Sequence, residues 1–315
     1  MEVTIEGVSK KIMDSISSVM VGQQEALKLM IGAFLAGGHL LVEGVPGIAK
    51  TLMARLLASS VDVDFSRIQF TPDLLPGDVL GSNIYRANSG QFEFIKGPVF
   101  TNILLADEIN RAPAKTQSAL FEVMEEQQVT IDGFTYKLPT PFMVVATQNP
   151  IELEGTYPLP EAQLDRFMIK INMGFPSRAE EIEILHKFKS DFGRINEKDL
   201  KPVVSQAEIL SAHALVQAIF IKDELIHYLA DLTMATRKHE GLILGASPRA
   251  TLSILKMSKA MAGLSGREYV IPEDLIDVLK PALLHRLIID PEKAIAGQNV
   301  DTILTEIIDS VPIPR

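Results

Sequence analysis

Short apolar runs alternate with helical stretches over the first 174 residues of the chain. Two of these runs, Ile103–Ala106 and Met143–Ala146, are apolar at every position, which is typical of strands covered on both faces. Strands that alternate with helices favour a parallel sheet flanked by helices, so the sequence predicts the α/β class. The strand candidates are His39–Val45, Val63–Thr71, Asn102–Ile109, Phe142–Asn149 and Phe167–Met173.

Beyond Pro176 the apolar residues recur at helical spacing, and strand patterns nearly vanish. We therefore place a domain boundary near Phe175–Arg178, which divides the chain into domains 1–176 and 177–315. The last helix opens at Pro272, where the missing N–H of proline does no harm. The helix candidates are Ala179–Phe188, Glu208–Phe220, Lys222–His239, Pro248–Leu264 and Pro272–Leu284.

Composition narrows the classes of protein. With 315 residues, 47% of them hydrophobic, the chain can bury a substantial core. No apolar run approaches the roughly 18–20 residues that span a bilayer, and the start lacks a signal-peptide pattern, so we expect a cytoplasmic protein without a membrane segment. Without cysteine, a metal must be held by oxygen or imidazole, and oxygen suits Mg²⁺. A net charge of −10 argues against a stable nucleic-acid partner, and the six scattered histidines are expected to be structural.

The segment GVPGIAKT, residues 44–51, lies between an apolar strand and a helical stretch, which is the context of a phosphate-binding loop. Backbone N–H groups would wrap the phosphates, Lys50 would reach the β and γ phosphates, and the Thr51 hydroxyl would bind Mg²⁺. Alanine stands at position 49, where glycine is usual, and we expect Ala49 to adopt ordinary right-handed helical backbone. The alternative is a glycine-rich turn followed by a chance lysine. The predicted nucleotide-contacting residues here are Gly44, Val45, Pro46, Gly47, Ile48, Ala49, Lys50, Thr51 and Leu52.

Polar residues stand at the ends of two later strand candidates, Asn102–Ile109 and Phe142–Asn149. Asp107 and Glu108 follow the apolar run at 103–106, and given the loop upstream, Asp107 is the expected direct or second-sphere partner of Mg²⁺. Glu108 is then placed to orient or activate the attacking water. Asn149 ends the following strand at the same edge of the sheet and could hold that water, although Asn before Pro is also a common turn former.

Five segments in order, GVPGIAKT, ILLADEINRAP, ATQNP, EAQLDRF and GASPRA, resemble the AAA+ ATPases, and specifically their MoxR branch. The resemblance runs from Val21 to about Arg286, and alanine before the loop lysine is usual in that branch. It implies a P-loop NTPase fold with a three-layer αβα core, a five-stranded parallel sheet of order 5-1-4-3-2 and a C-terminal all-helical lid. It also implies ATP and Mg²⁺ as ligands and a ring as the working form, commonly a homo-hexamer.

The same resemblance assigns roles to residues outside the loop. Arg166 matches the arginine finger that a neighbouring subunit supplies, with an ion pair to Asp165 or another acid as the alternative. Arg249 matches the sensor-2 arginine; a cation near a helix start favours a nearby anion, and nucleotide phosphate would suit. Gln23 belongs to Val21–Gln23, which resembles the family segment that lies beside the adenine. Arg111 is a further candidate for subunit contact.

Two segments resemble additions to a minimal nucleotide domain. Residues 73–98 are similar to the helix-2 insert of this branch, and residues 128–138, with a turn signal at Asp132-Gly133, are similar to its pre-sensor-1 hairpin. In relatives these elements face the substrate. Phe92, Phe134 and Tyr136 are therefore candidates for gripping a client, with local packing as the alternative.

The resulting hypothesis is a chaperone-like ATPase that remodels or matures a partner protein, commonly one with a von Willebrand factor A domain in this branch. The motor subunit of a metal chelatase is the alternative that the sequence separates least well. A nucleic-acid motor is disfavoured by the acidic composition. A non-hydrolysing nucleotide-binding scaffold is disfavoured because Lys50, Asp107, Glu108, Asn149 and Arg166 are all present.

Overall fold

A parallel sheet of five strands forms the centre of the N-terminal part of the computed structural model, which describes residues 3–45, 47–88, 90–150, 155–189 and 200–314. All five strands fall within the predicted segments, and their spatial order is β10-β1-β9-β6-β3. The predicted order 5-1-4-3-2 is therefore confirmed. The strands are β1 (Leu40–Gly44), β3 (Phe65–Gln69), β6 (Ile103–Asp107), β9 (Met143–Gln148) and β10 (Ile169–Met173).

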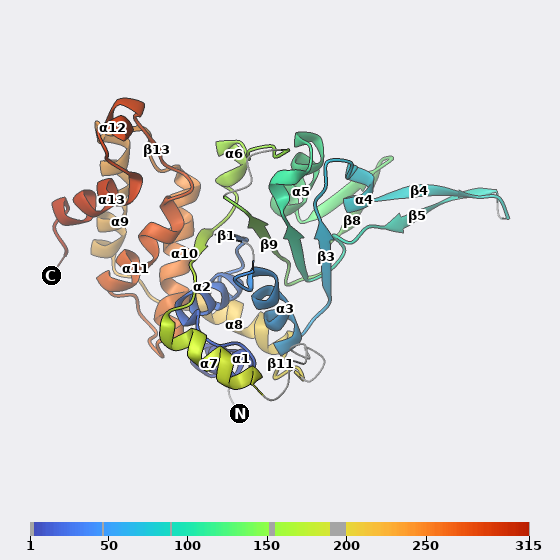
Figure 1. The fold of residues 1–315 in the computed structure, drawn as a ribbon, viewed down its shortest axis with the longest axis horizontal. Coiled ribbons are helices and arrows are strands. Elements are labelled where there is room, and N and C mark those ends of the chain that lie inside the picture. Colours follow the sequence, from blue (N-terminus) through green and yellow to red (C-terminus); the bar gives the residue numbers. More distant parts are fainter. Residues whose placement is uncertain (1–2, 46, 89, 151–154, 190–199, 315) are drawn as a thin grey trace.

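Helices cover both faces of this sheet (Figure 1). Along β6, Ile103 and Leu105 pack into one hydrophobic cluster, whereas Leu104 and Ala106 pack into a second cluster on the other face. Because successive residues of a strand point to opposite faces, an unbroken apolar run can serve both clusters. The first cluster also takes in α1 (Ile5–Ser17), α2 (Gln24–Leu35), α3 (Lys50–Ser60) and α8 (Gln206–Ala218), and the second takes in α5 (Ala114–Glu126).

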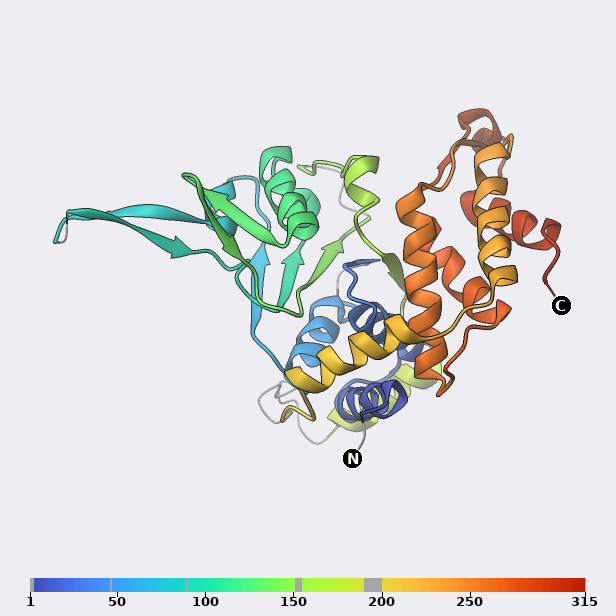
Figure 2. The same cartoon turned by 180° about the vertical axis from the view of Figure 1, so that it is seen from behind.

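Among the described residues from 223 onward, which form the lid, the regular elements are helices and one short antiparallel strand pair, β12–β13, that the sequence does not predict. Strands of two or three residues carry too little periodicity to be recognised. Helix α10 packs against α1, α2 and α8 as well as α11, so the lid and the core share a continuous hydrophobic cluster (Figure 2). The lid elements are α9 (Asp223–Lys238), β12 (Leu242–Leu244), α10 (Pro248–Leu264), α11 (Pro272–Leu283), β13 (Ile288–Ile289), α12 (Pro291–Ile295) and α13 (Val300–Ser310).

The segment between core and lid packs on the core side. Helix α8 contacts α1 and α2, and β11 pairs in parallel with β2. The division at residue 176 stays a prediction. Among the described residues, no helix combines the length and the apolar character needed to cross a bilayer. The remaining elements of this region and of the core are β2 (Val61–Asp62), the 3-10 helix η1 (Ile109–Arg111), α6 (Glu161–Leu164), α7 (Arg178–Phe188) and β11 (Val204–Ser205).

Two hairpins project from the core at the positions of the predicted additions (Figure 1). The second turns at Asp132 and Gly133 with φ of 50° and 83°, the pair of positive angles that the turn signal predicts. The hairpins touch each other through a hydrogen bond from Asn83 to Asp132. The first comprises α4 (Pro76–Leu80), β4 (Gly81–Arg86) and β5 (Gln91–Lys96), and the second comprises β7 (Gln128–Ile131) and β8 (Phe134–Lys137).

The aromatic residues of these hairpins fall into two groups. Tyr136 stacks on Phe94 with ring centroids 4.3 Å apart and meets Phe100 edge-on, so this residue packs locally. Phe134 and Phe92 are 68% and 72% exposed. Of the three candidates for client contact, therefore, only these two phenylalanines present an open ring surface.

Candidate nucleotide site

The loop between β1 and α3 has glycines at two positions where the backbone requires them. A side chain at Gly44 would clash with Ile48 and with the backbone oxygen of Met173, so glycine is needed for close packing there. Gly47 adopts φ of 86°, a conformation that glycine reaches without strain. Lys50 begins α3, and the loop N–H groups therefore gather at the positive end of that helix. Pro46 lies outside the described residues.

Ala49 departs from the sequence expectation. Its φ and ψ are 68° and 23°, in the left-handed region, so the prediction of ordinary helical backbone is wrong. Ala49 is the residue that caps α3, and a capping residue lies outside the helical conformation because the chain there still completes its turn into the helix. An alanine in this region costs about 1–2 kcal/mol relative to right-handed backbone. The loop thus holds alanine in a conformation that glycine would adopt more easily.

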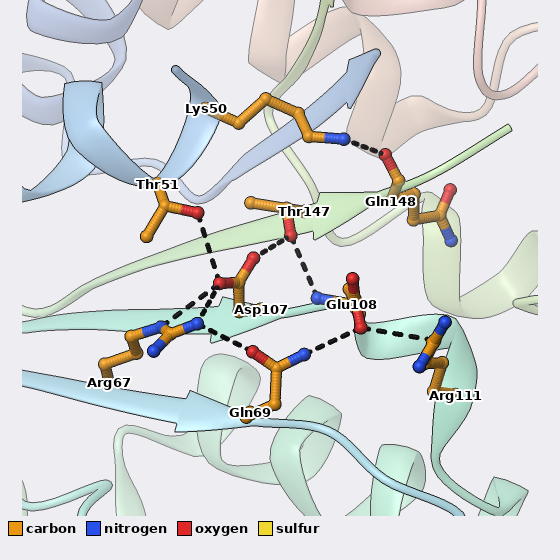
Figure 3. A network of polar contacts seen from close by, with 9 residues as sticks. All are labelled: Lys50, Thr51, Arg67, Gln69, Asp107, Glu108, Arg111, Thr147 and Gln148. Carbon is orange, nitrogen blue, oxygen red and sulfur yellow. Dashed lines mark hydrogen bonds and ion pairs between the residues drawn. The ribbon is translucent and has the colours of Figure 1, made fainter. Parts of the chain in front are cut away.

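The charged end of Lys50 bridges the loop and the central strand β9. Its Nζ donates to the backbone oxygens of Gly44 and of Gln148, the latter at 2.9 Å (Figure 3). Both of these acceptors are neutral carbonyls. A phosphate could therefore compete for the ammonium group.

The carboxylate of Asp107 is the most heavily bonded group of the site. It is 6% exposed, and its Oδ1 accepts a 2.6 Å hydrogen bond from the Thr147 hydroxyl. Its Oδ2 accepts from the Thr51 hydroxyl at 3.2 Å and from the guanidinium of Arg67, from Nη2 at 2.8 Å and from Nε at 3.1 Å (Figure 3). Asp107 is therefore fixed in orientation by three side chains.

Thr51 and Asp107 fit Mg²⁺. A hydroxyl and a carboxylate oxygen converge within 3.2 Å, and both are the hard oxygen ligands that this ion prefers. Among the described residues there is no group of three or more His, Cys, Asp or Glu side chains that could cage a metal. Because Mg²⁺ in nucleotide sites keeps several waters and binds substrate phosphates, two such protein groups suffice.

Glu108 is held beside this group by its backbone and by its side chain. Its φ is 56°, in the left-handed region, and its N–H donates to the Thr147 hydroxyl at 2.9 Å. Its Oε2 accepts from the Gln69 amide at 2.7 Å and pairs with Nε of Arg111 at 3.2 Å (Figure 3). Arg111 thus pairs with the acid three residues before it in the same chain.

These side chains line a cavity of about 550 Å³. It collects most of the predicted catalytic, metal and loop residues from three separate segments, as expected where the carboxyl ends of parallel strands meet. It also includes residues that the sequence analysis missed. The predicted lining residues are Gly47, Ala49, Lys50, Thr51, Leu52, Asp107, Glu108 and Asn149, and the additional ones are Arg55, Arg67, Gln69 and Thr147.

Arg166 and Arg249 lie in a different cavity, of about 270 Å³, which shares no lining residue with the first among the described residues. Both pair with one carboxylate, that of Glu125 on α5; for Arg166 the ion pair measures 2.9 Å. The anion beside Arg249 in this structure is therefore a carboxylate. The acid that pairs with Arg166 is Glu125 and not its sequence neighbour Asp165.

Asp165 instead joins the core to the lid. It forms an ion pair of 3.1 Å with Arg286 and accepts hydrogen bonds of 2.8 and 2.9 Å from the Ser247 hydroxyl. Arg286 is 4% exposed, and burial lowers its pKa to about 10 although the charge of Asp165 opposes that shift. The residue next to Arg166 in the sequence is thus tied to residues of the lid.

Gln23 lies in a third cavity, of about 560 Å³, between the start of α2 and α11. Its side-chain amide donates to the backbone oxygen of Gly174 at 3.1 Å.

The buried His39 behaves as the expected structural histidine. Its Nδ1 accepts from the Val144 N–H, so Nε2 carries the proton and donates to the Met124 carbonyl, and burial lowers its pKa to about 4. This imidazole is neutral at physiological pH.

The sheet topology, the loop before α3 and the acids at the end of β6 define a P-loop nucleoside triphosphatase. Residues 39–169 match the profile of the ATPase family associated with various cellular activities (AAA), and residues 234–307 match that of the AAA lid domain. The chain is 43% identical to chaperone MoxR1 of Mycobacterium tuberculosis, over 95% of this chain and 81% of the relative. It is 45% identical to the uncharacterized protein YeaC of Bacillus subtilis, over 96% and 94%.

A solved structure agrees with these sequence relatives. The crystal structure of a candidate ATPase from Cytophaga hutchinsonii superimposes with a TM-score of 0.90 at 41% identity, covering 99% of this chain and 96% of that one. The chain therefore belongs to the MoxR family of AAA+ ATPases, and it is an ATPase.

Proposed function

We propose that this protein binds ATP with Mg²⁺ in the 550 Å³ cavity and hydrolyses it to ADP and phosphate. The observation that carries the proposal is the convergence of Lys50, Thr51, Asp107 and Glu108 on that one cavity. Lys50 binds the β and γ phosphates in place of the backbone oxygens of Gly44 and Gln148. Glu108 orients the attacking water, and Asn149, from the neighbouring strand end, helps to hold that water.

Thr51 and Asp107 are the residues that hold the metal in this proposal. A bound Mg²⁺ would supply positive charge that offsets the negative charge on the phosphates. Thr51 presents its hydroxyl oxygen from the first turn of α3, and Asp107 accepts the hydroxyl hydrogen at the same time. Gln23, which lines a separate cavity, is the proposed contact of the adenine end.

Replacing Lys50 with alanine is expected to weaken ATP binding about 100-fold, because one charge-assisted contact to phosphate is lost at about 2.7 kcal/mol. Titration of a fluorescent ATP analogue measures the affinity. Lys259→Ala is the matched control, since its Nζ also donates to a backbone carbonyl but on the exposed face of α10. Unchanged affinity in Lys50→Ala would place the nucleotide elsewhere.

We further propose that the working form is a homo-hexameric ring. Arg166 and Arg249 do not line the cavity that holds the catalytic acids, which supports a role at the nucleotide of a neighbouring subunit. Light scattering of the Glu108→Gln form with ATP and Mg²⁺ tests this. A mass six times that of the 34.6 kDa chain supports the ring, and a monomer at every concentration contradicts it.

The proposed use of the energy is to remodel or mature a client protein, with a von Willebrand factor A domain protein as a candidate partner. The relative named chaperone MoxR1 supports a chaperone-like role. The exposed rings of Phe92 and Phe134 at the projecting hairpins support direct contact with a polypeptide.

Substituting Phe134 with alanine should weaken the binding of an unfolded polypeptide by about 5- to 30-fold, the usual effect of truncating an aromatic anchor. Fluorescence anisotropy of labelled casein, with the Glu108→Gln form and ATP, measures the affinity. Phe220→Ala is the control, because this ring is also largely exposed but lies two residues beyond the end of α8, away from the hairpins. Equal affinities for the two variants would remove Phe134 from the client surface.

A further inference from the structure

Arg67 reaches from β3 to the strand end at which the metal carboxylate lies. In the parallel pairing of β3 with β6, Leu105 is the register partner of Arg67, and Asp107 is the partner of Gln69. The Arg67 side chain therefore extends two residues along the neighbouring strand before its guanidinium meets Asp107 (Figure 3). Of the two side chains, Arg67 is 39% exposed and Asp107 is 9% exposed.

The guanidinium binds the same Asp107 oxygen that contacts Thr51, the other residue predicted to hold the metal. Oδ2 of Asp107 accepts from two nitrogens of Arg67 and also from the Thr51 hydroxyl. A carboxylate oxygen has two lone-pair positions, so three donors already exceed what it accommodates without sharing. A second cation at this oxygen would meet both the crowding and the permanent positive charge of arginine.

Gln69 fixes the orientation of the guanidinium. Its Oε1 accepts from Nη2 of Arg67 at 2.7 Å, while its Nε2 donates to Glu108 at 2.7 Å. The amide is therefore held from both sides, with its oxygen toward Arg67. Because Nη2 also donates to Asp107, the fork of Arg67 is clamped between Gln69 and the carboxylate.

We propose that Arg67 is an internal counter-ion that competes with Mg²⁺ for Asp107, so that loading of the metal–nucleotide complex is an exchange of one cation for another. The inference rests on the proposed use of Mg²⁺ at Thr51 and Asp107. Before loading, Arg67 neutralises a carboxylate that is almost fully buried and stands next to a second acid. On loading, its bonds to Oδ2 give way, and the guanidinium leaves its clamp between Asp107 and Gln69. Arg67 and Gln69 are positioning residues, since neither is assigned a contact with the reacting atoms.

Replacing Arg67 with methionine tests the exchange, because this change removes the charge and keeps an unbranched side chain. We expect the Mg²⁺ concentration for half-maximal binding of a non-hydrolysable fluorescent ATP analogue to fall about tenfold. Arg67→Lys keeps the positive charge but loses the two-nitrogen contact with Asp107. Gln69→Leu removes the hydrogen bond that holds the guanidinium in place. Each variant should lower the Mg²⁺ concentration for half-maximal binding about threefold. The measurement is equilibrium binding and needs no turnover.

Arg86→Met is the matched control, because it breaks an ion pair of 2.7 Å with Glu93 on the projecting hairpin and should leave the Mg²⁺ requirement unchanged. If folded Arg67→Met needs the same or a higher Mg²⁺ concentration for half-maximal binding of the analogue, the proposal is overturned. If that variant does not fold, an unchanged requirement in Arg67→Lys and Gln69→Leu overturns it equally. A wild-type protein that binds the analogue as well in EDTA as in Mg²⁺ would instead refute the magnesium site itself.

Discussion

Replacing Glu108 with glutamine is expected to slow ATP hydrolysis by about 10²- to 10⁴-fold, the usual contribution of a general base. ATP affinity should stay within about threefold of wild type, because glutamine has nearly the same shape and Glu108 contacts neither Lys50 nor Thr51 in the described contacts. The Gln69 amide can still donate to the oxygen of a glutamine at this position. Phosphate release measures turnover, and analogue binding measures affinity.

The control for this prediction is Glu181→Gln, which neutralises an exposed carboxylate on α7 and should change neither quantity. A loss of binding that parallels the loss of turnover would show that Glu108 supports the structure of the site, through its bonds to Gln69 and Arg111, more than the chemistry. Turnover within tenfold of wild type would assign the water to another residue, with Asn149 as the remaining candidate in the same cavity.

The sheet could be predicted from the sequence because its central strands are buried on both faces. Strands β6 and β9 are buried along nearly their whole length, so their apolar runs are unbroken and easy to locate. The carboxyl ends of parallel strands must share one edge, which is why the sequence alone groups Asp107, Glu108 and Asn149. The order of the strands followed from the family resemblance.

Arg67 and Gln69 could not be recognised in the same way. They lie on the edge strand β3, where most positions are only partly buried and polar residues are ordinary. Only the register of β3 against β6 brings their side chains to Asp107 and Glu108, and register is a tertiary property. Glu125 escaped notice for a related reason, since its partners come from a distant part of the core and from the lid.

The conformation of Ala49 shows a second limit. Intrinsic preference places alanine in right-handed helix, and that preference is only about 1–2 kcal/mol per residue. The packing of Gly44 against β10, the path of the loop and the start of α3 together impose a left-handed residue at this point. A local preference of this size is therefore overruled by the surrounding structure.

Replacing Arg166 with alanine is expected to lower turnover by about 10³- to 10⁵-fold, or about 4–7 kcal/mol, if it serves as an arginine finger. ATP binding should be retained, because Arg166 does not line the cavity of its own subunit. Its present partners are Glu125 and the backbone oxygen of Phe121, and a neighbour's phosphates must compete with that pair. Arg178→Ala, at the start of α7, is a control for the loss of one surface arginine.

Mixing the Glu108→Gln and Arg166→Ala proteins decides whether the arginine acts between subunits. Each variant alone is inactive, but a mixed ring contains interfaces at which an intact Glu108 meets an intact Arg166 from the neighbour. If Arg166 acts across the interface, activity should return to about a quarter of wild type at equal mixing, since one interface in four then carries both intact groups at random assembly. If Arg166 acts on its own subunit's nucleotide, no site is complete, and mixed rings shown to be stable by native mass measurement stay inactive. The same experiment bears on the ion pair between Arg166 and Glu125. Glu125 can restrain Arg166 only as long as no phosphate from a neighbouring subunit has taken the place of the Glu125 carboxylate.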